Sequence, residues 1–347
     1  MSNEKILRGV PKAYYGAYGG ITPFPICLKS VSDYLGDPLD YTFAIVACGG
    51  AFRFTWDTTG WNGGNVDIAH TYDDYETVFR NGVTALGREF AMLWRAGNAW
   101  GRPGNGAKED FKAFIKAQID EGAPVISLGP IGPAEAGIIT GYRDGGGTLL
   151  GWSLFQWDEK TFNEDGYFIT DRWWDEGDFF GAMSLGRVAA PRADETEIIK
   201  NAIAALGGRQ DGQYAKGVAA YDAWKKALLG AEEKDFAMMP DWGQSIAAMC
   251  QGDATDCLID GRKNAYLYFR FLADKHPGNP RYAEIAEHFG NIAKLIHEKI
   301  YAALGGHERG EAQNRALAQL ETRRKIAEGI DELKALDEKA LALMKAL

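Results

Sequence analysis

Hydrophobic residues recur at helical spacing directly after two prolines near the start of the chain. In the stretch TPFPICLKSVSDYLG, residues 22–36, apolar side chains fall two to four positions apart. Pro23 and Pro25 fit just before a helix and not inside one, and Gly36 is typical of a helix end. The pattern therefore predicts a helix that has Cys27 in its first turn.

The pattern up to residue 190 mixes helical spacing with short alternating runs. Glycine pairs and aromatic residues separate the short apolar runs, as they do between strands. Helices followed by consecutive strands predict an α+β fold and not an alternating βαβ sheet. The expected helices are residues 73–87 and 110–121, with 41–50 a helix or a strand, and the expected strands are 89–96, 123–129, 166–170 and two within 135–156 joined by a hairpin at 143–147.

After residue 195 the chain is rich in Ala, Glu, Lys and Leu, and its pattern predicts an all-helical bundle. Asp194 or Thr196 is the expected cap of the first helix. In the last helix, Gly329 is expected to cause a break or kink. That helix fits a solvated pair closing the bundle, with a dimerising coiled coil as the alternative. The expected helices are residues 194–206, 213–229, 241–251, 260–275, 280–303 and 308–346.

Length and composition favour two domains, residues 1–190 and 191–347. Eight of the ten tryptophans precede residue 180, and the chain has 347 residues. A formal net charge of −10 disfavours nucleic acid and anionic membranes as partners. The polar start lacks the apolar segment of a signal peptide, and no apolar run has the length of a membrane span. We therefore expect a cytoplasmic protein with four free cysteines.

Cys27 is the first candidate for chemistry. A cysteine in the first turn of a helix lies near unpaired backbone N–H groups, which favour a thiolate and lower the thiol pKa. Those N–H groups, including that of Cys27, would also hold an oxyanion. The alternative is that Cys27 is a small buried apolar residue, the more common fate of a free cysteine.

Three segments of the N-terminal half resemble a known family. They are PICLKSVSDYLG, CGGAFRF and GAPVISLGPIGPAEAGIITGYRDGGGTLLG, within residues 20–160. Together they resemble the C39-type, papain-like cysteine peptidases, and more closely the N-terminal domain of the butirosin biosynthesis protein H family. The resemblance implies a papain-like (C39-like) N-terminal domain with Cys27 as nucleophile. It also implies acyl transfer from an acyl carrier protein to an amine of a small molecule.

The histidine base of that family has no counterpart in this sequence. Its position, six residues before Gly141, is Glu135. A buried glutamate can act as a base if its pKa rises, but an ionised carboxylate beside a thiol raises the cysteine pKa. The residue that orients the base would come from a segment offering Ser153, Gln156 and Asp158.

Further residues were weighed as parts of a binding site. Trp56 and Arg53 fall on opposite faces of an expected strand, and Trp152 and Tyr142 belong to the segment that resembles the family's cleft. His70 is expected to be an exposed surface residue, its protonated form favoured by nearby aspartates, and it is also an alternative base. His288 and His297 lack metal-ligand spacing, so we expect neither a metal nor a cofactor.

Two functions remain open on the sequence. The first is thiol-dependent acyl or amide transfer, or hydrolysis, on a small molecule or peptide, with Cys27, Glu135 and Ser153 as catalytic residues. The second is a catalytically inactive papain-like module that binds a small molecule or peptide. A homodimer is an open alternative for the assembly.

Overall fold

The computed structural model describes residues 3–97, 104–158, 160–175, 178–230 and 246–347. The chain divides into two compact units. Unit 1 consists of Met1–Ala44 and Phe79–Ala193, and unit 2 of Ile45–Val78 and Asp194–Leu347. The return to unit 2 at residue 194 falls close to the predicted boundary at 190. Residues 45–78, expected in the first domain, group with unit 2.

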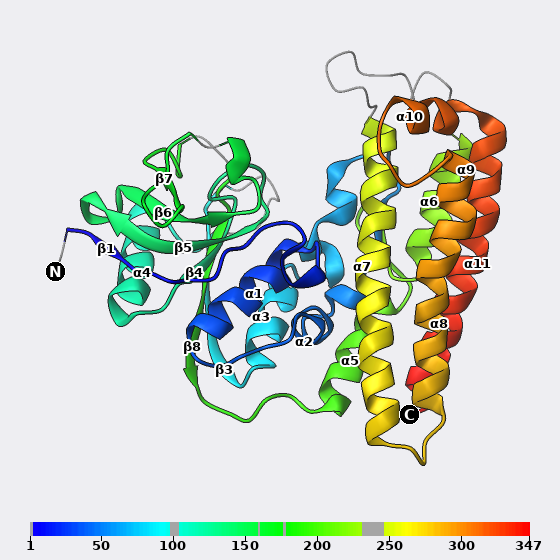
Figure 1. Ribbon diagram of the computed structural model, residues 1–347, viewed down its shortest axis with the longest axis horizontal. Helices are drawn as coiled ribbons and strands as arrows, with labels where there is room; N and C mark the ends of the chain where they lie inside the picture. Colours follow the sequence, from blue (N-terminus) through cyan, green and yellow to red (C-terminus); the bar gives the residue numbers. More distant parts are fainter. Residues whose placement is uncertain (1–2, 98–103, 159, 176–177, 231–245) are drawn as a thin grey trace. The chain divides into compact units, whose positions relative to one another are not determined.

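Unit 1 contains one antiparallel sheet with helices packed against it (Figure 1). The prediction of an α+β fold is confirmed for this half of the chain. The strand order is β3-β8-β4-β5-β6-β7, and β1 pairs with β5. The strands are β1 (Lys5–Ile6), β3 (Arg88–Trp94), β4 (Val125–Leu128), β5 (Ala136–Arg143), β6 (Thr148–Ser153), β7 (Phe168–Thr170) and β8 (Gly181–Val188).

Strand β8 was not predicted, although it lies between β3 and β4 in the sheet. Its sequence, GAMSLGRV, carries two glycines, which weaken the strand pattern. In the sheet these glycines meet close neighbours. A Cβ at Gly181 would lie 2.9 Å from the methyl of Met92, and one at Gly186 would lie 3.0 Å from the backbone of Glu89. Close packing of β3 against β8 therefore explains the two glycines that weaken the strand pattern in the sequence.

The helices of unit 1 follow the predicted hydrophobic spacing. Helix α1 (Pro23–Tyr34) contacts β5 and β4, and α4 (Lys108–Glu121) contacts β5 and β1. In α4, Phe111, Ile115 and Ile119 recur every four residues and are fully buried. Gly122 ends α4 with a φ of 90°, a left-handed conformation that favours glycine. Helices α2 (Tyr41–Ala47) and α3 (Thr77–Thr84) each contain a boundary between the two units, after Ala44 and after Val78.

Unit 2 combines a three-stranded antiparallel sheet with long helices. Its strands, in the order β2-β10-β9, are β2 (Thr55–Asp57), β9 (Arg209–Asp211) and β10 (Tyr214–Lys216). Helices α7, α8 and α11 run beside one another, and α6 packs on α11 (Figure 1). The helices are α5 (Glu195–Leu206), α6 (Ala219–Gly230), α7 (Ile246–Lys275), α8 (Arg281–Leu295), α9 (Ala302–Leu304), α10 (Glu311–Ala318) and α11 (Leu320–Lys345), with a π-helical turn at Ile296–Tyr301.

The prediction of an all-helical C-terminal half is wrong at the β9–β10 hairpin. Residues 213–216 were expected to begin a helix, but they pair with β9 and β2 instead. Asp194 caps α5 as predicted, because its side chain accepts a hydrogen bond from the Glu197 N–H. Within residues 246–275, the two predicted segments form the single helix α7, while the predicted residues 241–245 lie outside the described residues.

Gly329 neither breaks nor kinks the last helix, contrary to the prediction. The break falls at Gln319, between α10 and α11, and α11 continues through Gly329. A Cβ at Gly329 would lie 3.0 Å from the Cβ of Lys299. The glycine therefore permits close approach of the π-helical turn to α11, and the tertiary contact compensates for its weak helix propensity.

The core of unit 2 encloses a fully buried ion pair. Arg262 on α7 donates to Asp337 on α11, with Nη2 2.7 Å from Oδ2, and neither side chain is exposed. The Tyr221 hydroxyl donates to the same carboxylate at 2.7 Å.

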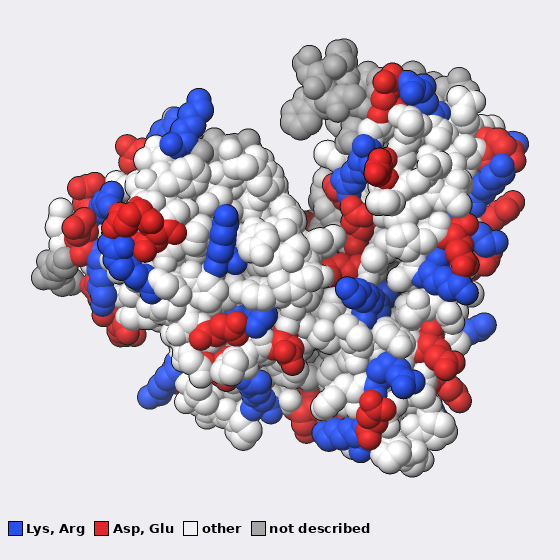
Figure 2. All heavy atoms as spheres, viewed as in Figure 1, with Lys and Arg blue, Asp and Glu red and all other residues white. Residues whose placement is uncertain are grey.

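On the face drawn in Figure 2, acidic and basic side chains are interspersed, and neither positive nor negative side chains form a continuous patch.

Candidate functional site

Cys27 lies one turn deeper in its helix than predicted. Helix α1 begins at Pro23, and the Ile26 N–H already donates to the Thr22 carbonyl at 3.3 Å. The N–H of Cys27 therefore falls within the repeating helical hydrogen bonds. Pro23 and Pro25 have no N–H, so the first turn offers few donors for an oxyanion. The predicted first-turn position of Cys27 is wrong, and the start of α1 has fewer free backbone N–H groups than expected.

The environment of Cys27 opposes thiolate formation. Its side chain is 0% exposed. Burial raises the pKa of the Cys27 thiol well above its usual range, and the charge of Glu135 raises it further. Both causes favour the neutral thiol, which is a poor nucleophile.

Glu135 lies within electrostatic reach of Cys27, just before β5. Its backbone is tied into the turn that precedes the strand. The Gly129 N–H donates to the Glu135 carbonyl at 2.8 Å, and the Glu135 N–H donates to the Pro133 carbonyl at 2.6 Å. The fold thus brings the predicted cysteine and carboxylate together. An ionised carboxylate at this position acts against the thiolate and not for it.

Ser153 is engaged in turn structure at the end of β6. Its Oγ donates to the Ile131 carbonyl at 3.1 Å and accepts from the Phe155 N–H at 3.1 Å. Its own N–H donates to Gln156 Oε1 at 3.1 Å. These bonds connect the loop after β6 to the loop that carries Glu135. The geometry therefore gives Ser153 and Gln156 a positioning role in the loops.

Trp152 and Tyr142 are buried in contacts that hold the sheet of unit 1. The Trp152 indole donates to the Val10 carbonyl at 2.9 Å. The Tyr142 hydroxyl donates to Asp120 Oδ1 at 2.7 Å, and burial together with this carboxylate raises the pKa of Tyr142 to about 12. Tyr142 is seven residues after Glu135, a separation of about 23 Å along an extended strand. Tyr142 is therefore not part of a site around Cys27 and Glu135.

Arg53 and Trp56 belong to unit 2. Arg53 donates to the Val66 carbonyl and to Cys257 Sγ, the latter at 3.2 Å. Trp56 is fully buried and stacks on Trp224 with ring centroids 5.7 Å apart. Both side chains thus contribute to the core contacts of unit 2.

His70 is buried, contrary to the prediction of an exposed, protonated residue. Its ring lies against Tyr214 and Tyr75, with centroids 4.1 and 5.0 Å away, and 4% of the residue is exposed. Burial, and to a smaller extent the charge of Lys216, lowers the pKa of His70 to about 4. Desolvation outweighs the nearby aspartates, because a charged imidazole loses its hydration in this environment. Among the residues that the structure describes, none is a hydrogen-bond partner of His70 Nδ1.

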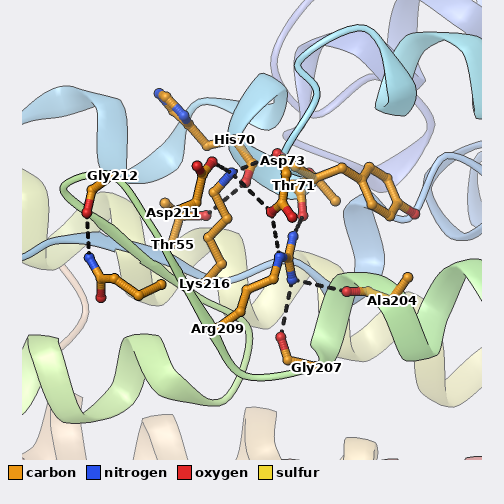
Figure 3. Close-up of polar contacts among 12 residues, drawn as sticks. Thr55, His70, Thr71, Asp73, Ala204, Gly207, Arg209, Asp211, Gly212 and Lys216 are labelled. Atoms are coloured by element: carbon orange, nitrogen blue, oxygen red, sulfur yellow. Dashed lines mark hydrogen bonds and ion pairs between the residues drawn. The ribbon is translucent and has the colours of Figure 1, made fainter.

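A polar cluster around Lys216 was not foreseen from the sequence. Lys216 is buried on β10, and its ammonium donates to the Tyr72 carbonyl at 2.6 Å and to Asp211 at 2.5 Å. Figure 3 shows Arg209 beside it, donating to Asp73 at 2.6 Å and to the Thr71 carbonyl at 2.8 Å. These contacts connect the β9–β10 hairpin to residues 71–73. The expected helix at 213–229 concealed them, because it placed Lys216 on a helical face.

An exposed aromatic cluster in unit 1, here called the aromatic loop patch, was also missed. It consists of the exposed Tyr14, Tyr15 and Trp157 and the half-buried Phe155. The exposed fractions are 51% for Tyr14, 41% for Tyr15 and 63% for Trp157. The ring centroids of Tyr15, Phe155 and Trp157 lie 5.2–6.0 Å apart. The signals in the sequence were the closely spaced tyrosines of KAYYGAYGG and the nearby pair in LFQW.

Glycine turns and one strained residue hold the first loop of this patch. Gly16 and Gly19 have φ values of 89° and 75°, and Tyr18 has φ 58°, which is unusual for a residue with a side chain. The Gly16 N–H donates to the Gly20 carbonyl at 2.9 Å, and the Tyr18 hydroxyl hydrogen-bonds Ser30 Oγ on α1 at 2.9 Å. The loop is therefore fixed against the helix that carries Cys27.

Lys12 provides a cation at the edge of the aromatic loop patch. Its ammonium lies 5.8 Å from the Tyr14 ring centroid and 5.5 Å from that of Trp152. Within the described part of the chain, this exposed lysine forms no ion pair. The patch therefore combines exposed ring faces with one accessible positive charge.

Comparison with protein-family models and with curated proteins found no match. Among the described residues, no three His, Cys, Asp or Glu side chains come together as a set of metal ligands. None of the helices in the described ranges has the length and apolar character needed to span a membrane.

Proposed function

We propose that unit 1 is a papain-like (C39-like) domain that does not use Cys27 as a nucleophile and that binds a small molecule or peptide. The resemblance to the butirosin biosynthesis protein H family supports the scaffold, since Cys27 on α1 and Glu135 before β5 occupy the matching positions. The observation that carries the inactive assignment is the complete burial of Cys27 beside a carboxylate. A working cysteine nucleophile needs access to substrate and a lowered pKa, and Cys27 has neither.

The aromatic loop patch is the proposed binding surface. Exposed aromatic rings bind flat or apolar groups with little loss of side-chain entropy, because each ring has few rotatable bonds. The fixed loop at residues 14–20 reduces the ordering cost of binding. Lys12 at the edge favours a ligand that carries a carboxylate next to its ring. We therefore propose a peptide end or small acid with an aromatic side group.

Thiol-dependent acyl transfer or hydrolysis is the competing function. It would require Cys27 to become exposed and Glu135 to accept the thiol proton. The proximity of these two residues favours it, and an acyl carrier protein would then be the expected donor. The depleted donors at the start of α1 and the raised thiol pKa count against it.

Alkylation of the native protein by iodoacetamide, followed by mass spectrometry, tests the inactive assignment. Cys257, which is partly exposed, serves as the internal reference. We expect Cys27 to react more slowly than Cys257 between pH 7 and 9.5 and to become reactive in urea. Glu135→Gln should leave this order unchanged, because it removes a charge without exposing the thiol. Faster labelling of Cys27 than of Cys257, or acylation of Cys27 by an acyl thioester, would overturn the assignment.

Binding is tested with N-acetyltryptophan and N-acetylphenylalanine, each as carboxylate and as amide, by saturation-transfer NMR. The carboxylates should give the stronger signals with the wild type. Trp157→Ala and Tyr15→Ala should reduce all signals, and Lys12→Gln should remove only the preference for carboxylates. Phe162→Ala is the matched control, since Phe162 is 45% exposed outside the patch. Equal signals for the patch variants and the control would contradict the proposed surface.

A further inference from the structure

The loop at residues 14–20 lies against α1 beside Cys27. Its Tyr18 hydroxyl hydrogen-bonds Ser30 Oγ at 2.9 Å, and Ser30 is fully buried. Ser30 follows Cys27 by three positions on α1, so the two side chains share one face of the helix. Burial raises the pKa of the Tyr18 phenol, and the nearby Cys27 acts in the same direction to a smaller extent. The phenol is therefore close enough to Cys27 to cover part of that face of α1.

The backbone of Tyr18 is strained in this position. Its φ of 58° and ψ of 16° belong to the left-handed region, which is unfavourable for a residue with a side chain. Gly16 and Gly19 also have positive φ values, but glycine adopts them without this cost. Two side-chain contacts of Tyr18 offset the strain, namely the hydrogen bond to Ser30 and the Lys29 ammonium, which lies 4.6 Å from the ring centroid. Loss of the hydrogen bond therefore favours another conformation of the loop.

The same loop carries half of the aromatic loop patch. Tyr14 and Tyr15 precede Tyr18 in the loop, whereas Phe155 and Trp157 come from the segment after β6. The ring of Tyr15 contacts those of Phe155 and Trp157, with centroid distances of 5.6 and 6.0 Å. The relative position of the two halves of the patch therefore depends on the conformation of the loop.

We propose that the hydrogen bond between Tyr18 and Ser30, here called the Tyr18 latch, holds the loop in a closed conformation that has two consequences. The closed loop presents Tyr15 to a ligand of the aromatic loop patch, and it shields Cys27 from solvent. When the latch breaks, the loop withdraws Tyr15 from the patch and exposes Cys27. The effect on the ligand rests on the proposed binding function of unit 1, whereas the shielding of Cys27 does not depend on it.

Ligand binding at the patch and the burial of Cys27 are linked through the loop. A ligand that needs Tyr15 beside the other rings binds the closed loop more tightly than the open one. Such a ligand shifts the loop toward the closed conformation, because a ligand stabilises the state that it prefers. An aromatic acid bound at the patch should therefore protect Cys27 from alkylation, although it does not touch the sulfur.

The rate of Cys27 alkylation by iodoacetamide, followed by mass spectrometry of the native protein, tests the latch without any ligand. Tyr18→Phe and Ser30→Ala should each raise the rate about fivefold, because each removes one hydrogen bond that opposes opening of the loop. The double variant should react no faster than either single one, since both changes remove the same bond. Tyr142→Phe is the matched control, because it removes another tyrosine hydrogen bond of unit 1, the one to Asp120. Single variants that leave the rate unchanged, or an equal rise in the control, overturn the latch.

N-acetyltryptophan separates the latch from the proposed function. At about ten times its dissociation constant it should slow the alkylation of Cys27 in the wild type by about tenfold, because the bound ligand holds the loop closed. The rate at Cys257, which belongs to unit 2, should stay the same. Binding in saturation-transfer NMR without protection of Cys27 overturns the coupling and leaves the binding function intact. No binding at all contradicts the proposed function, and the rates of the variants alone then support or overturn the latch.

Discussion

Cys27 in unit 1 and Lys216 in unit 2 both have buried, titratable side chains. The surroundings of Cys27 disfavour a charged side chain, whereas those of Lys216 provide oppositely charged partners. Cys27 lies at zero exposure with a carboxylate acting against its ionisation. Lys216 is equally buried, yet its ammonium contacts two aspartates and a backbone carbonyl. The comparison shows that a reactive residue type predicts little until its partners are known, because burial without a partner selects the neutral form.

The largest expected effect concerns another buried cation, Arg262, and the removal of its partner Asp337. Asp337→Ala should destabilise the protein by about 3–5 kcal/mol, because it leaves the Arg262 charge unpaired in the core of unit 2. Urea unfolding measures the effect. Asp331→Ala is the control on the same helix. Its carboxylate pairs with Lys225 at the surface, so the cost should be at most about 1 kcal/mol. Equal costs would contradict the importance of burial.

The second test uses pH and the neutral His70. Its folded pKa of about 4 lies below the ordinary value of 6.5. The stability from keeping His70 neutral is therefore complete above pH 6.5 and is lost as pH falls toward 4, by up to about 3 kcal/mol. Burial is the main cause, Lys216 and Arg53 act in the same direction, and Asp211 and Asp57 oppose them.

Comparison of the wild type with His70→Phe isolates this effect. Burial raises the pKa of Asp67 to about 6, so that carboxyl favours folding at low pH and acts with the opposite sign. Asp67 is present in both proteins, and its contribution cancels in the difference. Lowering the pH from 7.5 to 4.5 should therefore reduce the unfolding free energy of the wild type relative to that of His70→Phe, by up to about 3 kcal/mol. Identical pH dependence in both proteins would show that His70 is not buried.

The third test removes the cation of the Lys216 cluster. Lys216→Met keeps the length of the side chain and deletes its bonds to Tyr72 and Asp211. We expect a loss of about 2–3 kcal/mol, because the Tyr72 carbonyl loses a charged donor. Lys226→Met is the control, since Lys226 is exposed on α6 and its loss should change stability by about 0.5 kcal/mol or less. An equally small change for Lys216→Met would mean that the cluster does not stabilise the hairpin.

The smallest expected effect belongs to Cys27. Cys27→Ala deletes one buried sulfur atom and should cost about 1 kcal/mol through the small cavity it leaves. Thermal or urea unfolding gives the cost, and ligand binding at the aromatic loop patch should persist. Loss of an acyl-transfer activity in this variant, with stability retained, would reverse the comparison and make Cys27 the functional residue.

Local signals in the sequence predicted much of unit 1 and less of unit 2. The four-residue spacing in α4 and the Asp194 cap act over a few residues, so they were readable. The proline pair correctly marked the start of α1, although both prolines lie in its first turn and not before it. His70 packs on Tyr214, and Lys216 donates to the Tyr72 carbonyl, across more than a hundred residues of sequence, and no local pattern reports these contacts. Strand β8 and Gly329 were misread for a related reason, since close packing there selects glycine against its own propensity.

The candidate site was likewise predicted only in part from the sequence. The pairing of Cys27 with Glu135 was foreseen through the family resemblance. The burial of the cysteine was not, although the sequence analysis had weighed it as the common alternative. Tyr142 lies too far along β5, and Arg53 and Trp56 fold into unit 2. Alternation along a strand shows which side chains share a face, but it does not show which unit covers that face.

The two prolines that begin α1 also limit how this scaffold could be redesigned as an enzyme. Introducing the missing base as Glu135→His would remove the opposing charge, yet Pro23 and Pro25 would still supply no N–H to a tetrahedral intermediate. A designer would have to replace both prolines and open a path to the sulfur, at a cost to the rigid entry of the helix. Converting the protein into a thiol catalyst would therefore require several coordinated substitutions. Those in the first turn of α1 would matter as much as the one that introduces the base.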